Sequence, residues 1–283
     1  MARRDGTKLK NIDSMHVIMP LVYQGRCNNE AFLSETLDLT NVMAYLEKKK
    51  GLDPDYKYNL FQVMVTAMLK TITLRPKLNY FIADRTMYER NYISAGFTVK
   101  KEFKDDGDES LAVIKAKPDD TIDTIHEAIR KRVKERKDPN ITDGATDFMD
   151  SLKNLPGPIL KIIGSIFCWL DQKGLVPKSI TDDYIFMNSV VVANIGSIGL
   201  GAGLHHLVEF GTTSLFLVIG EMKKRPFWDE EGNMTMKQSV DISLTIDERI
   251  VDGFYYAKSI RLFKKLIECP ELLDRPLSEE VEF

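Results

Sequence analysis

The most constraining feature of this sequence is a strand-like run near the C-terminus that leads through a short charged segment into a helix-like run. The strand-like run is VDISLTI (240–246), the charged segment is DERIVDG (247–253), and the helix-like run covers 254–267. A glycine at the head of the helix permits a tight passage of the backbone from strand to helix. The C-terminal part of the domain is therefore predicted to be a strand, a turn and a helix, with charged residues in the turn.

Composition limits the kind of protein this is. The chain has 283 residues, 43% of them hydrophobic, which suits one large domain or two small ones. A net charge of −3 gives no support for binding to nucleic acid or to an anionic membrane. Cys27, Cys168 and Cys269 lack metal-site spacing and form no disulfide framework, so we expect a cytoplasmic protein. The N-terminus lacks the apolar core of a signal peptide, and no apolar run approaches the roughly 20 residues of a membrane span.

Periodicity and capping residues predict a mixture of helices and strands. Helices are expected over 41–50, 60–74 and 121–137, capped by Thr40, Asn59 and Asp120. The stretch 31–39 is compatible with a strand, and further strands are expected near 80–83, 92–103, 110–115, 185–193, 214–220 and 234–246, with a hairpin turn at 105–108. This order lacks a regular βαβ rhythm, so the predicted class is α/β with a mixed sheet and helices packed on it.

Five blocks, in the same order, resemble the catalytic domain of the dihydrolipoyl acyltransferases of 2-oxoacid dehydrogenase complexes. They are ETLDLT (35–40), LRPKLN (74–79), VVVANIG (190–196), LFLVIG (215–220) and the DERIVDG segment, and the resemblance runs from about Ile12 to Leu273. Chloramphenicol acetyltransferase shares the fold of that family. The resemblance implies a two-layer sandwich of the chloramphenicol acetyltransferase type, with a mixed β-sheet and packed helices, assembled as a homotrimer.

The resemblance also suggests a domain organisation. We expect an N-terminal arm at 1–14, an acyltransferase-like domain at 15–275 and an acidic tail at 276–283, with no lipoyl domain in this chain. A helical insert at about 140–182 is longer than the family leads us to expect. Its apolar part, within 155–170, is too short to span a membrane. It is predicted to pack over the domain or between subunits, and the alternative is a helix that docks on a membrane surface or a partner.

The resemblance implies a reaction and shows where this chain departs from it. In the family, a histidine in a His-x-x-x-Asp-Gly motif takes the proton of a thiol, from CoA or dihydrolipoamide, and a serine stabilises the oxyanion at a site between two subunits. Here Glu248 stands at the histidine position, while Asp252 and Gly253 match the motif. Ala193 stands at the serine position, with the amide of Asn194 beside it.

Glu248 is a weak substitute for the family's base. The pKa of an ordinary glutamate is about 4.3 and that of a thiol about 8.5, so proton transfer is uphill by roughly 6 kcal/mol. Glu248 acts as a base only if burial raises its pKa, and otherwise it is expected to pair with a nearby cation. Asp252 is expected to pair with Arg26 or Arg249, which gives Asp252, Gly253 and Arg249 a supporting role in the site.

Two adjacent histidines are alternative candidates for the base. His205 and His206 lie in the connection that leaves the Ala193 strand, and Glu209 follows them as a group able to orient an imidazole. Their alternative role is that of loop or interface residues, and their spacing does not support a metal site. The glycines between 196 and 203 lack the lysine of a phosphate-binding loop and are interpreted as a flexible connection, while His126 is expected at the surface or at its boundary with the core.

Two functions follow from these residues. The first is an acyltransferase that uses acyl-CoA or another acyl thioester, with Glu248, His205 or His206 as base and Asn194 as oxyanion donor. The second is a non-catalytic trimeric protein of the same fold, a pseudoenzyme that binds or assembles. A scaffold that docks on a membrane through 155–170 is a weaker third alternative, and no metal or nucleic acid is expected.

Overall fold

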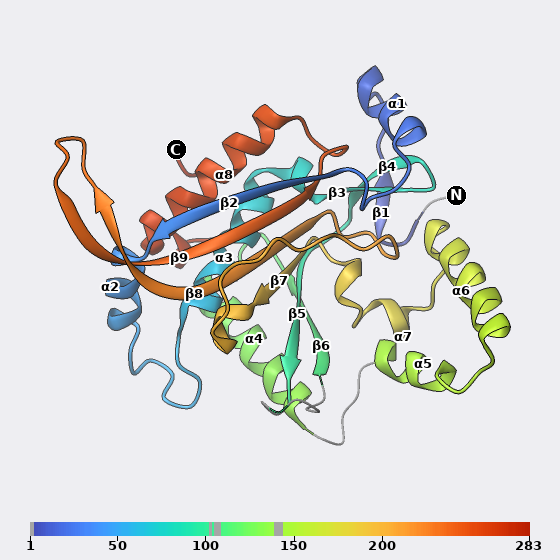
Figure 1. The fold of residues 1–283 in the computed structure, drawn as a ribbon, viewed down its shortest axis with the longest axis horizontal. Coiled ribbons are helices and arrows are strands. Elements are labelled where there is room, and N and C mark those ends of the chain that lie inside the picture. Colours follow the sequence, from blue (N-terminus) through green and yellow to red (C-terminus); the bar gives the residue numbers. More distant parts are fainter. Residues whose placement is uncertain (1–2, 102–103, 105–108, 139–143) are drawn as a thin grey trace.

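The main body of the protein is a six-stranded mixed sheet, seen in the computed structural model, which describes residues 3–101, 104, 109–138 and 144–283. The strand order is β2-β9-β8-β7-β5-β6 (Figure 1). Strand β7 runs parallel to both β5 and β8, and the other neighbours are antiparallel. The bounds are β2 (Glu30–Asp38), β5 (Ile93–Lys100), β6 (Glu109–Ala116), β7 (Val190–Asn194), β8 (Leu215–Trp228) and β9 (Met234–Asp247). The predicted mixed sheet is confirmed.

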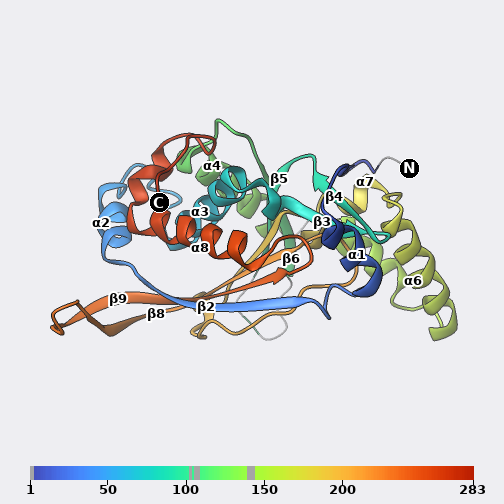
Figure 2. The same cartoon turned by 90° about the horizontal axis from the view of Figure 1, so that it is seen from above.

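A layer of helices covers one face of this sheet, as Figure 2 shows. The layer contains α2 (Thr40–Lys48), α3 (Leu60–Leu74), α4 (Ile122–Lys137) and α8 (Gly253–Glu268). Helix α3 begins where predicted, because Asn59 and Gln62 form a capping box. Its side chains are buried almost throughout and form the centre of the main hydrophobic core with the inward residues of the sheet. The two-layer sandwich is therefore as expected.

A second, three-stranded sheet includes the N-terminal segment. Its order is β1-β4-β3, with bounds β1 (Gly6–Lys8), β3 (Tyr80–Ala83) and β4 (Thr86–Arg90). Arg3, just before β1, is buried between Asp5 and the backbone carbonyls of Asp171 and Gln172. The described part of the predicted N-terminal arm therefore packs on the domain, because its strand hydrogen bonds and its buried arginine involve neighbouring segments.

The insert forms three helices beside the three-stranded sheet. They are α5 (Gly144–Leu152), α6 (Gly157–Gln172) and α7 (Lys178–Thr181). Phe167 of α6 stacks between Phe148 of α5 and Phe210, which anchors one side of the helix. The opposite side exposes the apolar side chains Ile159, Ile162, Ile166 and Trp169. No described helix is long and apolar enough to cross a lipid bilayer.

Several predicted boundaries are wrong by a few residues, and some elements were not predicted. Residues Ile185–Met187 form a 3-10 turn, so the predicted strand 185–193 begins only at Val190. Helix α4 is capped at Thr121 and not at Asp120, and β8 extends to Trp228. Helix α1 (Ser14–Val22) and strand β1 were not predicted, while the expected turn at 105–108 lies outside the described residues. Short 3-10 helices also cover Pro76–Asn79, Ile195–Ile198 and Pro270–Asp274.

The C-terminal tail returns to the domain. Leu277 is fully buried, and its N–H donates to the carbonyl oxygen of Asp120 over 2.9 Å. The N–H of Ser278 donates to Pro118 over 2.9 Å, and Arg275 pairs with Glu279 at 2.9 Å. The first residues of the predicted tail therefore hold the start of α4 in place.

Candidate functional site

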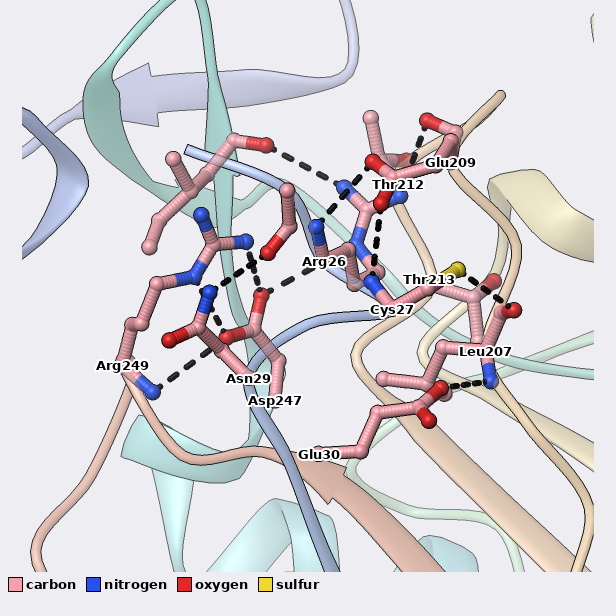
Figure 3. Close-up of polar contacts among 12 residues, drawn as sticks. Arg26, Cys27, Asn29, Glu30, Leu207, Glu209, Thr212, Thr213, Asp247 and Arg249 are labelled. Carbon is pink, nitrogen blue, oxygen red and sulfur yellow. Dashed lines mark hydrogen bonds and ion pairs between the residues drawn. The ribbon is translucent and has the colours of Figure 1, made fainter. Parts of the chain in front are cut away.

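A buried carboxylate, Asp247, is the centre of the polar cluster at the end of β9 (Figure 3). Arg249 binds it through two hydrogen bonds, from Nε and Nη2, each of 2.7 Å. The Nε atom of Arg26 lies 3.8 Å from the same carboxylate. Since all three side chains are buried, solvent does not screen the positive charges of the two arginines, and the aspartate offsets them.

The remaining donors of the two arginines bind backbone carbonyls from distant parts of the chain. Nη1 of Arg249 donates to the carbonyls of Tyr23 and Gln24, at 2.7 and 3.0 Å. Nη1 of Arg26 donates to Gly211 at 2.9 Å, and its Nη2 donates to Ile82 at 3.1 Å. The cluster thereby joins the segment before β2, the end of β3, the turn after β9 and the connection before β8.

The expected pairing of Asp252 with an arginine is wrong. Asp252 is exposed, and its Oδ1 accepts a hydrogen bond from the N–H of Tyr255 at 2.8 Å, so it caps α8. Bonds to backbone N–H groups lower its pKa, those of Tyr255 most. A Cβ added at Gly253 meets open space, so the expected close passage of the backbone there is absent in the described chain. Arg249 binds Asp247 instead. The sequence signal for this pair is an acidic residue at the end of a strand with an arginine two positions later.

Glu248 lies exposed in the turn between β9 and α8. Its backbone N–H donates to the carbonyl of Asn29 over 2.9 Å, which fixes the turn against the start of β2. Within the described residues its carboxylate has no cation partner, so the expected ion pair is absent there. Because Glu248 is exposed, it also lacks the burial that a carboxylate base requires.

His205 lies over the face of the sheet that the helices leave free. Its ring stacks on Phe216 of β8, with centroids 3.9 Å apart and planes inclined by 11°. Nδ1 lies 2.7 Å from the carbonyl oxygen of His206. Because a carbonyl oxygen only accepts, Nδ1 carries the proton and Nε2 of the neutral ring is left as a proton acceptor. The hydroxyl of Thr245 in β9 donates to the backbone carbonyl of His205 at 2.6 Å and holds the segment down on the sheet.

His206 lies at the surface, and Glu209 has partners other than the imidazole that was expected. His206 is exposed, and its Nδ1 lies 2.6 Å from the carbonyl oxygen of Leu207. Glu209 does not orient either imidazole, because its carboxylate accepts from the N–H groups of Arg26 and Cys27 at 3.0 and 2.9 Å. Burial opposes ionisation of Glu209, but these backbone donors outweigh it and lower its pKa. Glu209 therefore fixes the loop before β2.

Strand β7 contains both Ala193 and the proposed oxyanion donor Asn194 and directs their side chains to opposite faces of the sheet. Ala193 belongs to the small apolar cluster on the free face of the sheet, together with Phe216 and Val218. Asn194 follows it and is paired with Ile219, a residue of the main core, so the alternation of the strand directs it towards the other face. Gly196 is required next, because a Cβ there would lie 2.1 Å from the carbonyl oxygen of Gly220. The alanine, and not the asparagine, shares a face with His205.

Cys27 lies beside this cluster but is unsuited to act as a nucleophile. Its Sγ lies 3.0 Å from the carbonyl oxygen of Leu207. Burial, with the nearby charges of Glu209 and Glu30, raises the pKa of its thiol to about 11. The reactive thiolate is therefore scarce at neutral pH.

Selective labelling tests the state of this thiol. We expect iodoacetamide at pH 8 to modify the exposed Cys168 and to leave Cys27 unmodified, with labelling of Cys27 rising as the pH approaches 11. Peptide mass spectrometry of the native protein measures both sites in one sample. Equal labelling at pH 8 would show that the thiol of Cys27 is neither shielded nor raised in pKa.

One group of side chains has the composition of a metal site. Asp53, His126 and Glu127 bring potential ligand atoms within 4.8 Å of one another. Arg130 already lies 3.3 Å from both carboxylates and supplies the positive charge there. His126, expected at the surface or at its boundary with the core, is buried and stacks on Tyr58 with ring centroids 3.8 Å apart. The cluster is a packed polar contact between α4 and the segment before α3.

Comparisons with known proteins agree with the fold and with the C-terminal motif. Residues 179–274 match the family model of the 2-oxoacid dehydrogenases acyltransferase catalytic domain. No curated protein sequence matches the chain. A probable dihydrolipoamide acetyltransferase from Listeria monocytogenes 4b F2365 has a similar structure, with 16% identity, 98% of each chain covered and a TM-score of 0.60. The cubic core of the pyruvate dehydrogenase multienzyme complex gives 14% identity, 94% of each chain and a TM-score of 0.62.

Two further structures extend this likeness. The dihydrolipoamide acetyltransferase (E2p) of Azotobacter vinelandii shares 13% identity over 94% of each chain, with a TM-score of 0.60, and its description names a serine, a histidine and an asparagine in the catalytic mechanism. A chloramphenicol acetyltransferase shares 12% identity over 95% of this chain and 99% of its own, with a TM-score of 0.53. The resemblance predicted from the sequence is confirmed: residues 179–274 carry the pattern of the 2-oxoacid dehydrogenase acyltransferase catalytic domain, and the chain has the fold of those acyltransferase cores and of chloramphenicol acetyltransferase.

Proposed function

We propose that this protein transfers an acyl group between an acyl thioester, such as acyl-CoA, and another thiol, with His205 as the base. The observation that carries the proposal is the position of this imidazole. It stacks on Phe216, its Nδ1 is held by a carbonyl, and its Nε2 is left to accept a proton over the free face of the sheet. An imidazole held in a fixed orientation, as the half-buried ring of His205 is, is the most common general base in enzymes.

The proton transfers of such a reaction favour an imidazole over a carboxylate as the base. Nε2 of His205 takes the proton of the attacking thiol, and the thiolate forms a bond to the thioester carbonyl carbon. The tetrahedral intermediate then expels the second thiolate, which takes the proton back from the imidazole. An imidazole is in general a stronger base than a carboxylate, so removal of a thiol proton costs less free energy with a histidine than with a glutamate.

Glu248 and Asp252 keep the spacing of a catalytic pair. In the Azotobacter vinelandii enzyme, the histidine and the asparagine named for catalysis are four residues apart, as Glu248 and Asp252 are here. The exposed position of Glu248 supports a contact with substrate or with a second copy more than proton abstraction. His206 is close enough in sequence to His205 to shape the same opening, and its exposed ring supports a role in binding.

The free face of the sheet supports assembly into a homotrimer. Phe32 of β2, which pairs with Thr245, is an exposed apolar side chain on this face, and Met222 and Trp228 are exposed along β8, whose hairpin with β9 projects from the domain (Figure 1). Such a surface is typical of contact between subunits. We propose that a neighbouring subunit covers it and completes a channel in which CoA reaches His205.

The alternative is a non-catalytic trimer of the same fold. Its support is that Ala193 has no hydroxyl on the face that carries His205, while Asn194 is directed to the other face. A site with a base and no oxyanion donor binds thioesters better than it converts them, since loss of one such donor costs on the order of 10²–10³ in rate.

Restoring the missing hydroxyl distinguishes the two functions. We expect Ala193→Ser to raise the rate of thiol release from acetyl-CoA, with dihydrolipoamide as acceptor, by about 10-fold or more. Ala202→Ser is the control, because it adds the same hydroxyl in the connection after β7 and not on the strand itself. If CoA does not raise the melting temperature and neither protein releases thiol, the non-catalytic function stands.

A further inference from the structure

A cavity of about 260 Å³ lies where the insert meets the N-terminal segment and the edge of the main sheet. Arg4, Tyr92, Lys115, Asp171, Val176 and Lys178 are among the residues that line it. The residues between 171 and 182 come from the end of the insert, which the sequence marked as a departure from the family. None of the residues assigned to acyl transfer lines this cavity.

The charges of the cavity are not balanced. Arg3 and Asp5 neutralise each other through two hydrogen bonds of 2.9 Å, and Lys115 lies 3.6 Å from Asp182. Arg4 donates one hydrogen bond to the carbonyl oxygen of Val176, and neither Arg4 nor Lys178 has a carboxylate partner in the described residues. Two cations therefore remain available in this cavity.

The one remaining acidic group opposes an anion only weakly. Asp171 is 2% exposed, and its Oδ2 accepts from the N–H of Gly211 over 2.9 Å. Its Oδ1 has no hydrogen-bond partner within the described chain. Burial raises the pKa of Asp171, while the N–H of Gly211 and the charges of Arg3 and Arg26 act against that rise and offset the negative charge of the carboxylate.

The cavity has apolar and aromatic residues in its walls, and its volume is small. Val176 and Met187 are buried apolar residues, and the Tyr92 ring lies 5.0 Å below Nζ of Lys115. A volume of about 260 Å³ is below the roughly 300–1,000 Å³ of pockets for drug-sized ligands. The cavity therefore suits a molecule of a few carbon atoms with one anionic group.

We propose that this cavity binds a small organic anion, whose phosphate or carboxylate group is held by Arg4 and Lys178 and whose carbon body lies against Tyr92 and Val176. Arginine and lysine are the usual partners of both anionic groups. The proposal is independent of acyl transfer, since it requires none of the groups proposed for that reaction.

Calorimetric titration with inorganic phosphate, and separately with acetate, tests the site at constant ionic strength in chloride buffer. We expect saturable binding of at least one of the two anions to the unmodified protein. Arg4→Gln and Lys178→Gln should each weaken that binding on the order of 10-fold, because each removes one charge-assisted contact. Lys161→Gln, which removes one exposed charge from α6 outside the cavity, should leave it unchanged.

The comparison of the two anions identifies the preferred group, and three outcomes would show that Arg4 and Lys178 do not bind an anion here. They are no saturable binding of either anion, equal weakening in Lys161→Gln, and unchanged affinity in both cavity variants. Displacement of bound phosphate by CoA in the unmodified protein would assign the cavity to the thioester and reject a separate site. Melting temperatures of the same variants show whether weaker anion binding comes from a loss of folding. Their acyl-transfer rates show whether the proposed activity is affected separately from anion binding.

Discussion

Replacing Asp247 with alanine should lower the free energy of unfolding by about 3–5 kcal/mol. The substitution leaves Arg249 without its two 2.7 Å hydrogen bonds and both buried arginines without their shared carboxylate. Because these arginines hold four distant segments together, the loss acts on the tertiary arrangement and not on one helix or strand. Urea denaturation followed by circular dichroism measures the change.

An exposed pair of the same chemistry provides the control. Arg225 binds both oxygens of Asp241 on β9, but the two side chains are 37% and 29% exposed. Asp241→Ala should therefore cost no more than about 1 kcal/mol. If the two substitutions lower the free energy of unfolding equally, burial does not increase the contribution of the Asp247 cluster to stability.

Replacing His205 with alanine should reduce kcat/KM for acyl transfer by about 10²–10⁴, the usual contribution of a general base. His205 is the proposed base because its ring stacks on Phe216 over the free face of the sheet, with Nδ1 lying 2.7 Å from the carbonyl oxygen of His206. Since Thr245 binds the backbone of residue 205 and not its ring, the loop should keep its position in the variant. Steady-state rates with acetyl-CoA and a thiol acceptor measure the effect.

Neighbouring residues separate catalysis from folding. His206→Ala should lower the rate by less than 10-fold, because that ring is exposed and does not stack on Phe216. Glu248→Gln should also change the rate little, since its carboxylate is exposed at the turn. A large loss with Glu248→Gln and none with His205→Ala would assign the base to the glutamate instead.

Local pattern was sufficient where a segment's structure depends on its own residues. Helix α3 needed only its apolar spacing and the cap at Asn59, and both were visible in the sequence. The C-terminal strand and helix followed in the same way from alternation and from the turn at Asp247–Gly253. Strand β1 carried no such signal, because three residues acquire their conformation from pairing with β4.

The candidate site was predicted less well, because its contacts are distant in the sequence. The motif directed attention to Asp252 as the partner of an arginine, yet Asp252 is near solvent and caps α8. Asp247 takes both arginines because it ends β9 facing the cluster, and Arg26 reaches it from the segment before β2. No pattern within 247–253 distinguishes these two aspartates.

The sequence by itself determined the mixed α/β class and the order of the main elements, because these depend on local periodicity and on residue identity. Only the tertiary structure decided which of the remaining groups share a surface. Register across β7, β8 and β9 brings Ala193, Phe216 and Thr245 to one face, and the connection before β8 lays His205 over them. Such proximity comes from strand pairing and long-range hydrogen bonds, which form between residues that are far apart along the chain.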